Sequence, residues 1–218
     1  MCGRFALSSV ADLKARFNID PGDDIKPRYN IAPSQQILAI VNQGGYKLVE
    51  LKWGLVPFWT KDKAKAKGII NARAETLDTK PSFKHCLQRQ RCLIPADGFY
   101  EWKKEGNRKR PYRIIINGGE LFVFAGLWDR WRSPAGEVIN TCAIITTTAN
   151  KFMAPIHNRM PVILPKEREK IWLASNTDVG TLKSLLQPYP AQLLDSYEIS
   201  TLINSPHNDI PQVLEPVN

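Results

Sequence analysis

Four successive strand-like segments in the middle of the chain constrain its fold more than any other feature. They cover residues 91–102, 112–117, 120–131 and 137–148, and Gly, Asn and Pro turns separate them. Residues 117–119, which read Asn-Gly-Gly, predict a tight hairpin between the second and third of these strands. The succession favours a largely antiparallel sheet or an open barrel.

Further strands and helices are expected on both sides of this block. Residues 36–41 and 46–53 predict two strands across a Gln-Gly-Gly turn, and residues 193–201 predict a late strand. Residues 81–87 suit a short helix with proline in its first turn, and residues 167–174 and 179–186 have amphipathic helical patterns. The Lys-rich residues 61–67 are expected to form an exposed loop or a short helix.

An earlier helix is predicted near the start of the chain. Val10, Leu13 and Phe17 fall on one helical face, and Asp12 follows Ser9 by three residues, which is a weak form of the capping box. Residues 20–23, which read Asp-Pro-Gly-Asp, end the pattern.

The length is that of one domain, since 218 residues bury roughly 70% of the surface of the unfolded chain without staples. The sequence has no internal repeat, low-complexity tract or linker. We therefore expect residues 1–218 to form a single compact α+β domain. Its core would be a mostly antiparallel, open β-barrel-like sheet with flanking helices.

Charge and cysteine content narrow the class of protein. The chain has 30 Lys and Arg against 21 Asp and Glu, a net charge of +9, which favours a polyanionic partner such as nucleic acid. No CxxC pair or zinc spacing occurs among the cysteines, so we expect no metal and mostly free thiols. No secretory leader is evident and the apolar runs are too short to span a bilayer, so we expect a cytoplasmic protein that does not bind membranes.

Cys2 is the most informative residue for chemistry. Removal of Met1, which a small second side chain normally allows, would leave an amine and a thiol on adjacent carbons. The α-amine has a reference pKa near 8 and the thiol about 8.5, so both are partly nucleophilic at neutral pH. Such a group converts an aldehyde to an imine and then closes a thiazolidine ring. The alternative is an incidental cysteine in a frayed terminus.

Three other residues are candidates for proton transfer or positioning near Cys2. His157 lies in a non-periodic, proline-bounded segment, although it could be a loop histidine with a purely structural role. Glu101 lies in an aromatic strand where burial would raise its pKa, although it could also face solvent on an edge strand. Asn71 follows an apolar pair and could orient a reacting group, or simply form a turn.

Cationic and aromatic residues accompany these segments. Arg4, Arg73 and Arg159 each lie beside one of the candidate segments, and aromatic residues flank residues 54–57 and follow Glu101. Stacking surfaces beside cations are typical of single-stranded nucleic-acid binding. Several of the six tryptophans are equally suited to the core.

Taken together, six segments resemble the SRAP (SOS response-associated peptidase) family of abasic-site crosslinking proteins. They occur in the family's order as far as about residue 165: Met1-Cys2-Gly3-Arg4-Phe5, Tyr29-Asn30-Ile31-Ala32-Pro33, Trp53-Gly54-Leu55-Val56-Pro57, Asn71-Ala72-Arg73-Ala74-Glu75-Thr76, residues 91–102 and His157-Asn158-Arg159-Met160-Pro161.

The resemblance implies a fold, a reaction and a set of residues. The fold is an α+β domain with a β-barrel-like sheet and a basic groove, and it uses no metal or organic cofactor. The protein would bind single-stranded DNA as a monomer, near the nucleoid in a bacterium, and Cys2 would form a thiazolidine with the aldehyde of an abasic site. The implied catalytic residues are Cys2, Asn71, Glu101 and His157. The implied DNA-binding residues are Arg4, Pro33, Trp59, Arg73, Trp102, Thr146 and Arg159.

Three other functions remain open from the sequence. An amidotransferase-type glutaminase can also begin Met-Cys-Gly, although its substrate-holding motifs are not evident here. A peptidase using Cys2 and His157, acting on its own N-terminus, would fit the family name and the classes hydrolase, protease or lyase. A non-covalent reader of modified DNA would use the same groove without Cys2 chemistry.

Overall fold

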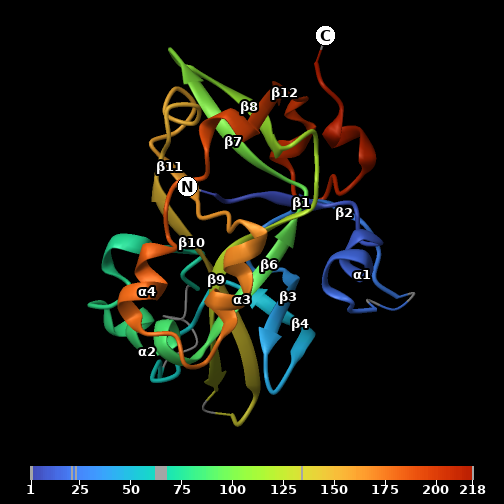
Figure 1. Ribbon diagram of the computed structural model, residues 1–218. Helices are drawn as coiled ribbons and strands as arrows, with labels where there is room; N and C mark the ends of the chain where they lie inside the picture. Colours follow the sequence, from blue (N-terminus) through green and yellow to red (C-terminus); the bar gives the residue numbers. More distant parts are fainter. Residues whose placement is uncertain (1, 21, 23, 62–67, 134, 218) are drawn as a thin grey trace.

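The chain folds into two β-sheets with short helices packed around them (Figure 1). The architecture comes from a computed structural model that describes residues 2–20, 22, 24–61, 68–133 and 135–217. Most strand pairings are antiparallel, while β10 also pairs in parallel with β4 and β5. The expected α+β class is therefore confirmed.

One sheet closes into a barrel of five strands. Its order is β10-β4-β3-β6-β9, and the ring closes because β9 pairs with both β6 and β10. The short strands β5 and β11 pair with the end of β10. The strands of this sheet are β3 (Gln36–Asn42), β4 (Tyr46–Trp53), β5 (Asn71–Arg73), β6 (Arg91–Ala96), β9 (Phe122–Arg132), β10 (Val138–Thr148) and β11 (Arg159–Pro161).

The second sheet carries both the N-terminal segment and the predicted carboxylate. Its order is β12-β8-β7-β1-β2, so β7 is flanked by strands on both sides. Its long β7–β8 hairpin projects from the body of the molecule at the top of Figure 1. Its strands are β1 (Phe5–Leu7), β2 (Arg28–Ile31), β7 (Gly98–Glu105), β8 (Arg108–Ile116) and β12 (Leu194–Glu198).

The prediction of one continuous strand over residues 91–102 is wrong. The chain breaks at Asp97 and passes from β6 in the barrel to β7 in the second sheet. The buried Asp97 carboxylate accepts hydrogen bonds from the backbone N–H of Ser8 and, at 2.8 Å, from that of Ser9, and it pairs with Arg113 at 3.1 Å. A Cβ at Gly98 would lie 2.6 Å from Nε of Arg113, so this corner suits glycine.

The hairpin predicted at residues 117–119 is also wrong. A turn forms there, with the N–H of Gly119 donating to the carbonyl of Ile116 at 2.8 Å, and Asn117 and Gly118 have positive φ. However, β8 and β9 belong to different sheets, so the turn links the sheets instead of pairing its two strands. The Asn-Gly-Gly sequence therefore predicted the turn. Which strands pair depends instead on the sheet to which the apolar face of each strand belongs.

The predicted helices are present, with bounds within a few residues of those expected. The breaker at residues 20–23 lies beyond the end of the first helix. Of residues 61–67, Lys61 is exposed and the others lie outside the described residues. The helices are α1 (Asp12–Phe17), α2 (Pro81–Arg89), α3 (Lys166–Leu173) and α4 (Val179–Ser184), with single 3₁₀ turns η1 (Ala74–Thr76), η2 (Ala191–Leu193), η3 (Thr201–Asn204) and η4 (Pro211–Leu214).

The capping box expected at the start of α1 does not form. The N-cap residue is Ala11, and it makes no side-chain hydrogen bond. Ser8 and Ser9 instead direct their N–H groups to the Asp97 carboxylate, which anchors the end of β1 to the corner between the sheets. Asp97 therefore fixes the segment that leads into α1 and does not cap the helix itself.

Buried apolar side chains form one large cluster on one face of the barrel strands and a second on the opposite face, against α2, α3 and α4. The largest group of buried side chains includes Cys2, Phe5, Trp53 and Phe124, and Phe5 makes edge-to-face ring contacts with Trp53 and Phe124 at centroid distances of 5.3 and 5.7 Å. The N-terminal segment is therefore part of the core. No helix within the described residues is long and apolar enough to cross a membrane.

Candidate active site

Cys2 lies in the core just before β1. Its side chain is fully buried, and the sulfur lies 4.0 Å from the carbonyl oxygen of Arg4. Burial raises the pKa of the Cys2 thiol well above its usual range, and the nearby charge of Glu101 raises it further. The buried thiol is therefore protonated at neutral pH and needs a base before it can act as a nucleophile.

Asn71 holds the backbone of Cys2. Asn71 begins β5, which is fixed against β10 by parallel pairing with Ile144. Its Nδ2 donates a hydrogen bond of 2.8 Å to the carbonyl oxygen of Cys2. Its Oδ1 is buried and has no hydrogen-bond partner within the described residues. A buried amide oxygen of this kind is an acceptor available to a ligand at Cys2.

Glu101 is a buried carboxyl group in the interior of its sheet. It is 3% exposed and lies in β7, between β1 and β8. Burial raises its pKa, and the charge of the nearby His157 partly opposes that shift. The expected burial and raised pKa of Glu101 are confirmed, and the alternative of a solvent-facing edge strand is wrong. A raised pKa brings a carboxyl group closer to the range in which general acid–base catalysis is most effective.

His157 is held in a fixed orientation by its own loop. The loop between β10 and β11 is tied down by a 2.9 Å bond from the His157 N–H to the carbonyl of Met153. The N–H of Arg159 donates to Nδ1 of His157 at 3.0 Å. The same Nδ1 also lies 3.2 Å from the carbonyl oxygen of Arg159, so the backbone of Arg159 fixes the orientation of the ring.

The four predicted side chains come together from four separate segments. Asn71 donates a hydrogen bond to the carbonyl oxygen of Cys2. The charge of Glu101 raises the pKa of the Cys2 thiol, and the charge of His157 lowers the pKa of Glu101. The sheet pairing explains this convergence, since β1 lies beside β7 while β5 and β11 both pair with β10. An acid–base pair and an amide thus surround one buried thiol.

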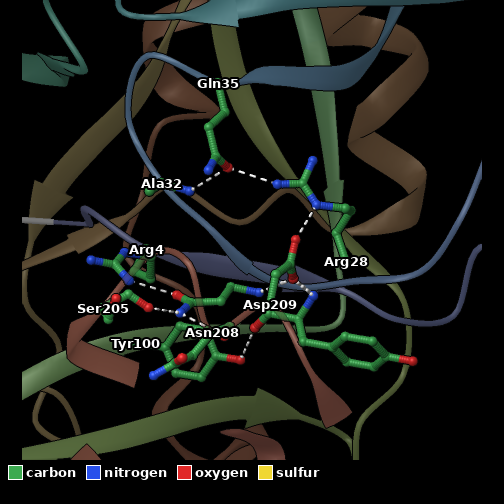
Figure 2. Close-up of polar contacts among 10 residues, drawn as sticks. Arg4, Arg28, Ala32, Gln35, Tyr100, Ser205, Asn208 and Asp209 are labelled. Atoms are coloured by element: carbon green, nitrogen blue, oxygen red, sulfur yellow. Dashed lines mark hydrogen bonds and ion pairs between the residues drawn. The ribbon is translucent and has the colours of Figure 1, made fainter. Parts of the chain in front are cut away.

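Arg4 is held by protein acceptors beside this site. Its Nη1 donates to Oδ1 of Asn30 at 2.6 Å and to the carbonyl of Ile203 at 2.7 Å; Figure 2 shows the bond to Asn30. Its guanidinium also lies 5.9 Å from the ring centroid of Trp102, whose Nε1 donates to Asn204 at 2.8 Å. The structure therefore fixes both residues in place with residues of the C-terminal segment.

Asp209 anchors that C-terminal segment to β2 (Figure 2). Its Oδ1 accepts the N–H groups of Tyr29 and Asn30 at 2.6 and 2.8 Å, and its Oδ2 pairs with Arg28. Asn30 in turn donates to the carbonyl of Asn208 at 3.0 Å. Sequence reasoning missed Asp209 because no local pattern links it to a strand 179 residues earlier in the chain.

Arg159, Thr146 and Arg73 form a second cluster. Arg159 makes a two-pronged contact with Glu75, at 2.6 and 3.0 Å, and donates to the carbonyl of Thr146 at 2.7 Å. Thr146 is buried and pairs with Arg73 across β5 and β10. Arg73 is exposed. Glu75 was not singled out from the sequence, yet it occupies the guanidinium face predicted to bind phosphate.

The predicted stacking residues Trp59 and Pro33 are both at least partly exposed. Trp59 is 44% exposed after β4 and meets Phe58 edge-to-face at 5.1 Å, while Pro33 is half-buried before β3. Within the described residues, no hydrogen bond, ion pair or ring contact joins either of them to Cys2. Their role in binding stays a prediction.

The remaining cysteines and histidines fall outside this site. Cys86, Cys92 and Cys142 are free and buried, and His85 is exposed on α2 with its ring 5.9 Å from that of Phe58. Among the residues that the structure describes, no three His, Cys, Asp or Glu side chains are grouped as metal ligands.

Comparison with known proteins identifies the family of this chain. The family described as SOS response associated peptidase (SRAP) matches residues 1–206. The chain belongs to this family, as its motifs predicted.

Individual relatives match most or all of the chain. The abasic site processing protein YoqW of Bacillus subtilis (strain 168) is 50% identical over 99% of each chain. The abasic site processing protein HMCES of Gallus gallus is 34% identical over 78% of this chain and 57% of its own length. A solved protein from Bacteroides thetaiotaomicron is 30% identical and superposes over 100% of both chains with a TM-score of 0.90.

Proposed function

We propose that this protein processes abasic sites by covalent attachment of Cys2, after removal of Met1, to the ring-opened aldehyde in single-stranded DNA. The convergence of Asn71, Glu101 and His157 on Cys2 carries this proposal. Membership of a family whose relatives are named abasic site processing proteins supports the choice of substrate. The net charge of +9 supports a DNA partner.

The first step is opening of the sugar and attack by the amine. His157 gives a proton to the ring oxygen of the closed deoxyribose while ionised Glu101 takes the proton of the anomeric hydroxyl group, and the aldehyde forms. The α-amine of Cys2 then adds to the aldehyde carbon. After a proton passes from nitrogen to oxygen, Glu101 protonates the resulting hydroxyl group, which leaves as water. The iminium nitrogen then returns a proton to His157, which leaves the imine.

The second step is ring closure by the thiol. Because burial keeps the Cys2 thiol protonated, ionised Glu101 takes the sulfhydryl proton as sulfur adds to the imine carbon. The proton is then returned to the nitrogen, so closure involves no net gain or loss of protons. Oδ1 of Asn71 accepts a hydrogen bond from that nitrogen or from a sugar hydroxyl.

The product protects the DNA strand. A free abasic aldehyde acidifies the neighbouring C–H and permits β-elimination, whereas a thiazolidine has no carbonyl group. The reaction modifies the protein itself, so the protein acts once or with slow reversal. Arg4, Arg73, Thr146 and Arg159 would contact phosphates, and Pro33, Trp59 and Trp102 would contact flanking bases.

An experiment on mass tests the chemistry. Intact protein without Met1, mixed with an abasic single-stranded oligonucleotide, should give one adduct whose mass is the sum of both minus one water. A bound complex that separates fully under denaturing conditions would contradict the covalent proposal and favour a non-covalent reader. Cleavage of added peptides or of glutamine without any adduct would favour the peptidase or the glutaminase.

A further inference from the structure

The hairpin of β7 and β8 continues outward from the site and carries an excess of positive charge. Residues 103–110 contain five Lys and Arg and one Glu. In the register of this hairpin, Lys103 faces Arg110 and Lys104 faces Lys109. Since side chains alternate along a strand, these two pairs lie on opposite faces of the hairpin.

One face of the hairpin is neutralised within the protein. Glu105 pairs with Lys103 at 2.8 Å and with Arg110 at 3.1 Å, and Glu198 of β12 binds the same Arg110 guanidinium with a 2.7 Å bond to Nε. Glu101 belongs to this face of β7, further inward. Lys103 and Arg110 on this face therefore already have carboxylate partners.

The other face is not neutralised. Lys104 and Lys109 are exposed, lie directly opposite one another, and make no hydrogen bond or ion pair with any described residue. Like charges directly opposite in an antiparallel pair destabilise the sheet. The pairing thus costs stability in the isolated protein and suits a polyanion that binds both ammonium groups.

This lysine pair continues a basic and aromatic track that begins at β1. Trp102 precedes Lys104 by two residues, so both side chains lie on the same face about 7 Å apart along the strand. Arg4 lies over the Trp102 ring. The track therefore runs from the Arg4 side chain to the tip of the hairpin, on the face of β7 opposite to Glu101.

We propose that Lys104 and Lys109 form a second DNA contact, which binds the phosphate backbone of the strand flanking the abasic site. The inference rests on the proposed function for its ligand and extends the bound strand outward along β7. It predicts that affinity increases with oligonucleotide length on one side of the abasic site, until the strand reaches the hairpin tip.

The test compares two variants that lose the same charge. Lys104→Gln with Lys109→Gln removes the pair, and Lys47→Gln with Lys170→Gln removes two exposed lysines elsewhere. With unmodified single-stranded DNA long enough to reach the tip, the hairpin variant should bind roughly three- to tenfold more weakly. The slope of log affinity against log salt should fall by about 1.4, at roughly 0.7 per phosphate contact. Lys104→Arg with Lys109→Arg should keep both values.

Three outcomes would overturn the inference. Equal losses in the hairpin and control variants would show a general charge effect. Equal losses on short and long oligonucleotides would place the contact within the central site. Unchanged DNA affinity with weakened binding of poly-glutamate would assign the pair to an acidic protein. Each of these leaves adduct formation at Cys2 intact in the wild type, which separates failure of this inference from failure of the proposed function.

The melting temperature of the hairpin variant shows whether weaker DNA binding results from misfolding. Removal of a like-charge pair should leave the melting temperature of the hairpin variant equal to or above that of the wild type. Weaker DNA binding together with an undiminished melting temperature therefore supports a binding role.

Discussion

The side-chain amide of Asn71 donates a hydrogen bond of 2.8 Å to the carbonyl oxygen of Cys2. This contact fixes the peptide group that follows the nucleophile, while Oδ1 of the same amide is buried and has no hydrogen-bond partner within the described residues. Strand β5, which is three residues long, is fixed by parallel pairing with β10, so the bond links Cys2 to the barrel. Placement of the reacting amine thus depends on a strand distant in sequence.

Replacement of Asn71 should slow the reaction more than it weakens binding. Asn71→Ala should lower the single-turnover rate of adduct formation about 10- to 100-fold, because a misplaced nucleophile loses proximity. The dissociation constant for unmodified single-stranded DNA should stay within about twofold, since phosphate contacts dominate it. Asn140→Ala, at an exposed asparagine near the start of β10, is the control. Equal loss of affinity and rate would contradict a positioning role.

Glu101 should make stability depend on pH in a defined direction. Because burial raises its pKa, the folded protein keeps a proton that the unfolded chain loses above about pH 4.3. This contribution is present at lower pH and is lost as pH rises through the folded pKa. Thermal melts across this range should therefore show Glu101→Gln gaining stability relative to the wild type as pH rises. Relative loss by the variant would contradict the assignment.

The same substitution should also block chemistry. Gln cannot take the proton of the Cys2 thiol, so thiazolidine closure should slow by about 10²- to 10⁴-fold. Trapping with borohydride distinguishes the step affected, since an accumulated imine is reduced and a closed ring is not. An unchanged closure rate in Glu101→Gln would remove this carboxyl group from the mechanism.

Glu75 should compete with DNA for Arg159. The pKa of Glu75 is lowered by its hydrogen bonds with Arg159, so the carboxylate is ionised at neutral pH. Glu75→Gln should free the guanidinium and strengthen binding of single-stranded DNA by about two- to fivefold. Glu167→Gln, which removes an equal charge from an exposed position on α3, serves as the control. A gain in affinity no larger than that of the control would mean that Arg159 has only a structural role, through its contacts with Glu75 and Thr146.

Asp209 should stabilise the fold through β2. Asp209→Asn loses charge on an acceptor of two backbone N–H groups and should lower the free energy of unfolding by about 1.5–3 kcal/mol. The partly exposed pair with Arg28 adds little. Denaturant unfolding measures the change. Asp195→Asn, at the exposed position of β12, is the control. An effect equal to that of the control would show that the C-terminal segment is held by other contacts.

Local sequence patterns predicted most elements because their periodicity and turns are local. The helix at residues 81–87 and the strands at residues 36–41 and 46–53 follow directly from such patterns. The break at Asp97 was not predictable in the same way, since it depends on Ser8, Ser9 and Arg113 meeting one carboxylate. The wrong hairpin at residues 117–119 has the same origin, because sheet membership is a property of the whole chain.

The candidate site was predicted for a different reason. Motif order named Cys2, Asn71, Glu101 and His157 as neighbours, and the pairing of β1 with β7 and of β5 with β10 brings their segments together. Partners that restrain the predicted phosphate ligands escaped prediction. Glu75 and Asn30 lie inside quoted motifs, but their binding of Arg159 and Arg4 depends on long-range geometry.

The most direct test of covalent attachment is a denaturing gel of the protein, without Met1, after incubation with single-stranded DNA that carries one abasic site. Parallel lanes hold Cys2→Ala, protein shown by mass to retain Met1, and DNA with an intact base. Covalent attachment through Cys2 predicts a heat- and denaturant-resistant band of reduced mobility that requires Cys2, a free α-amine and the abasic site together. The same band with Cys2→Ala, or no band with fully processed wild-type protein, would contradict it.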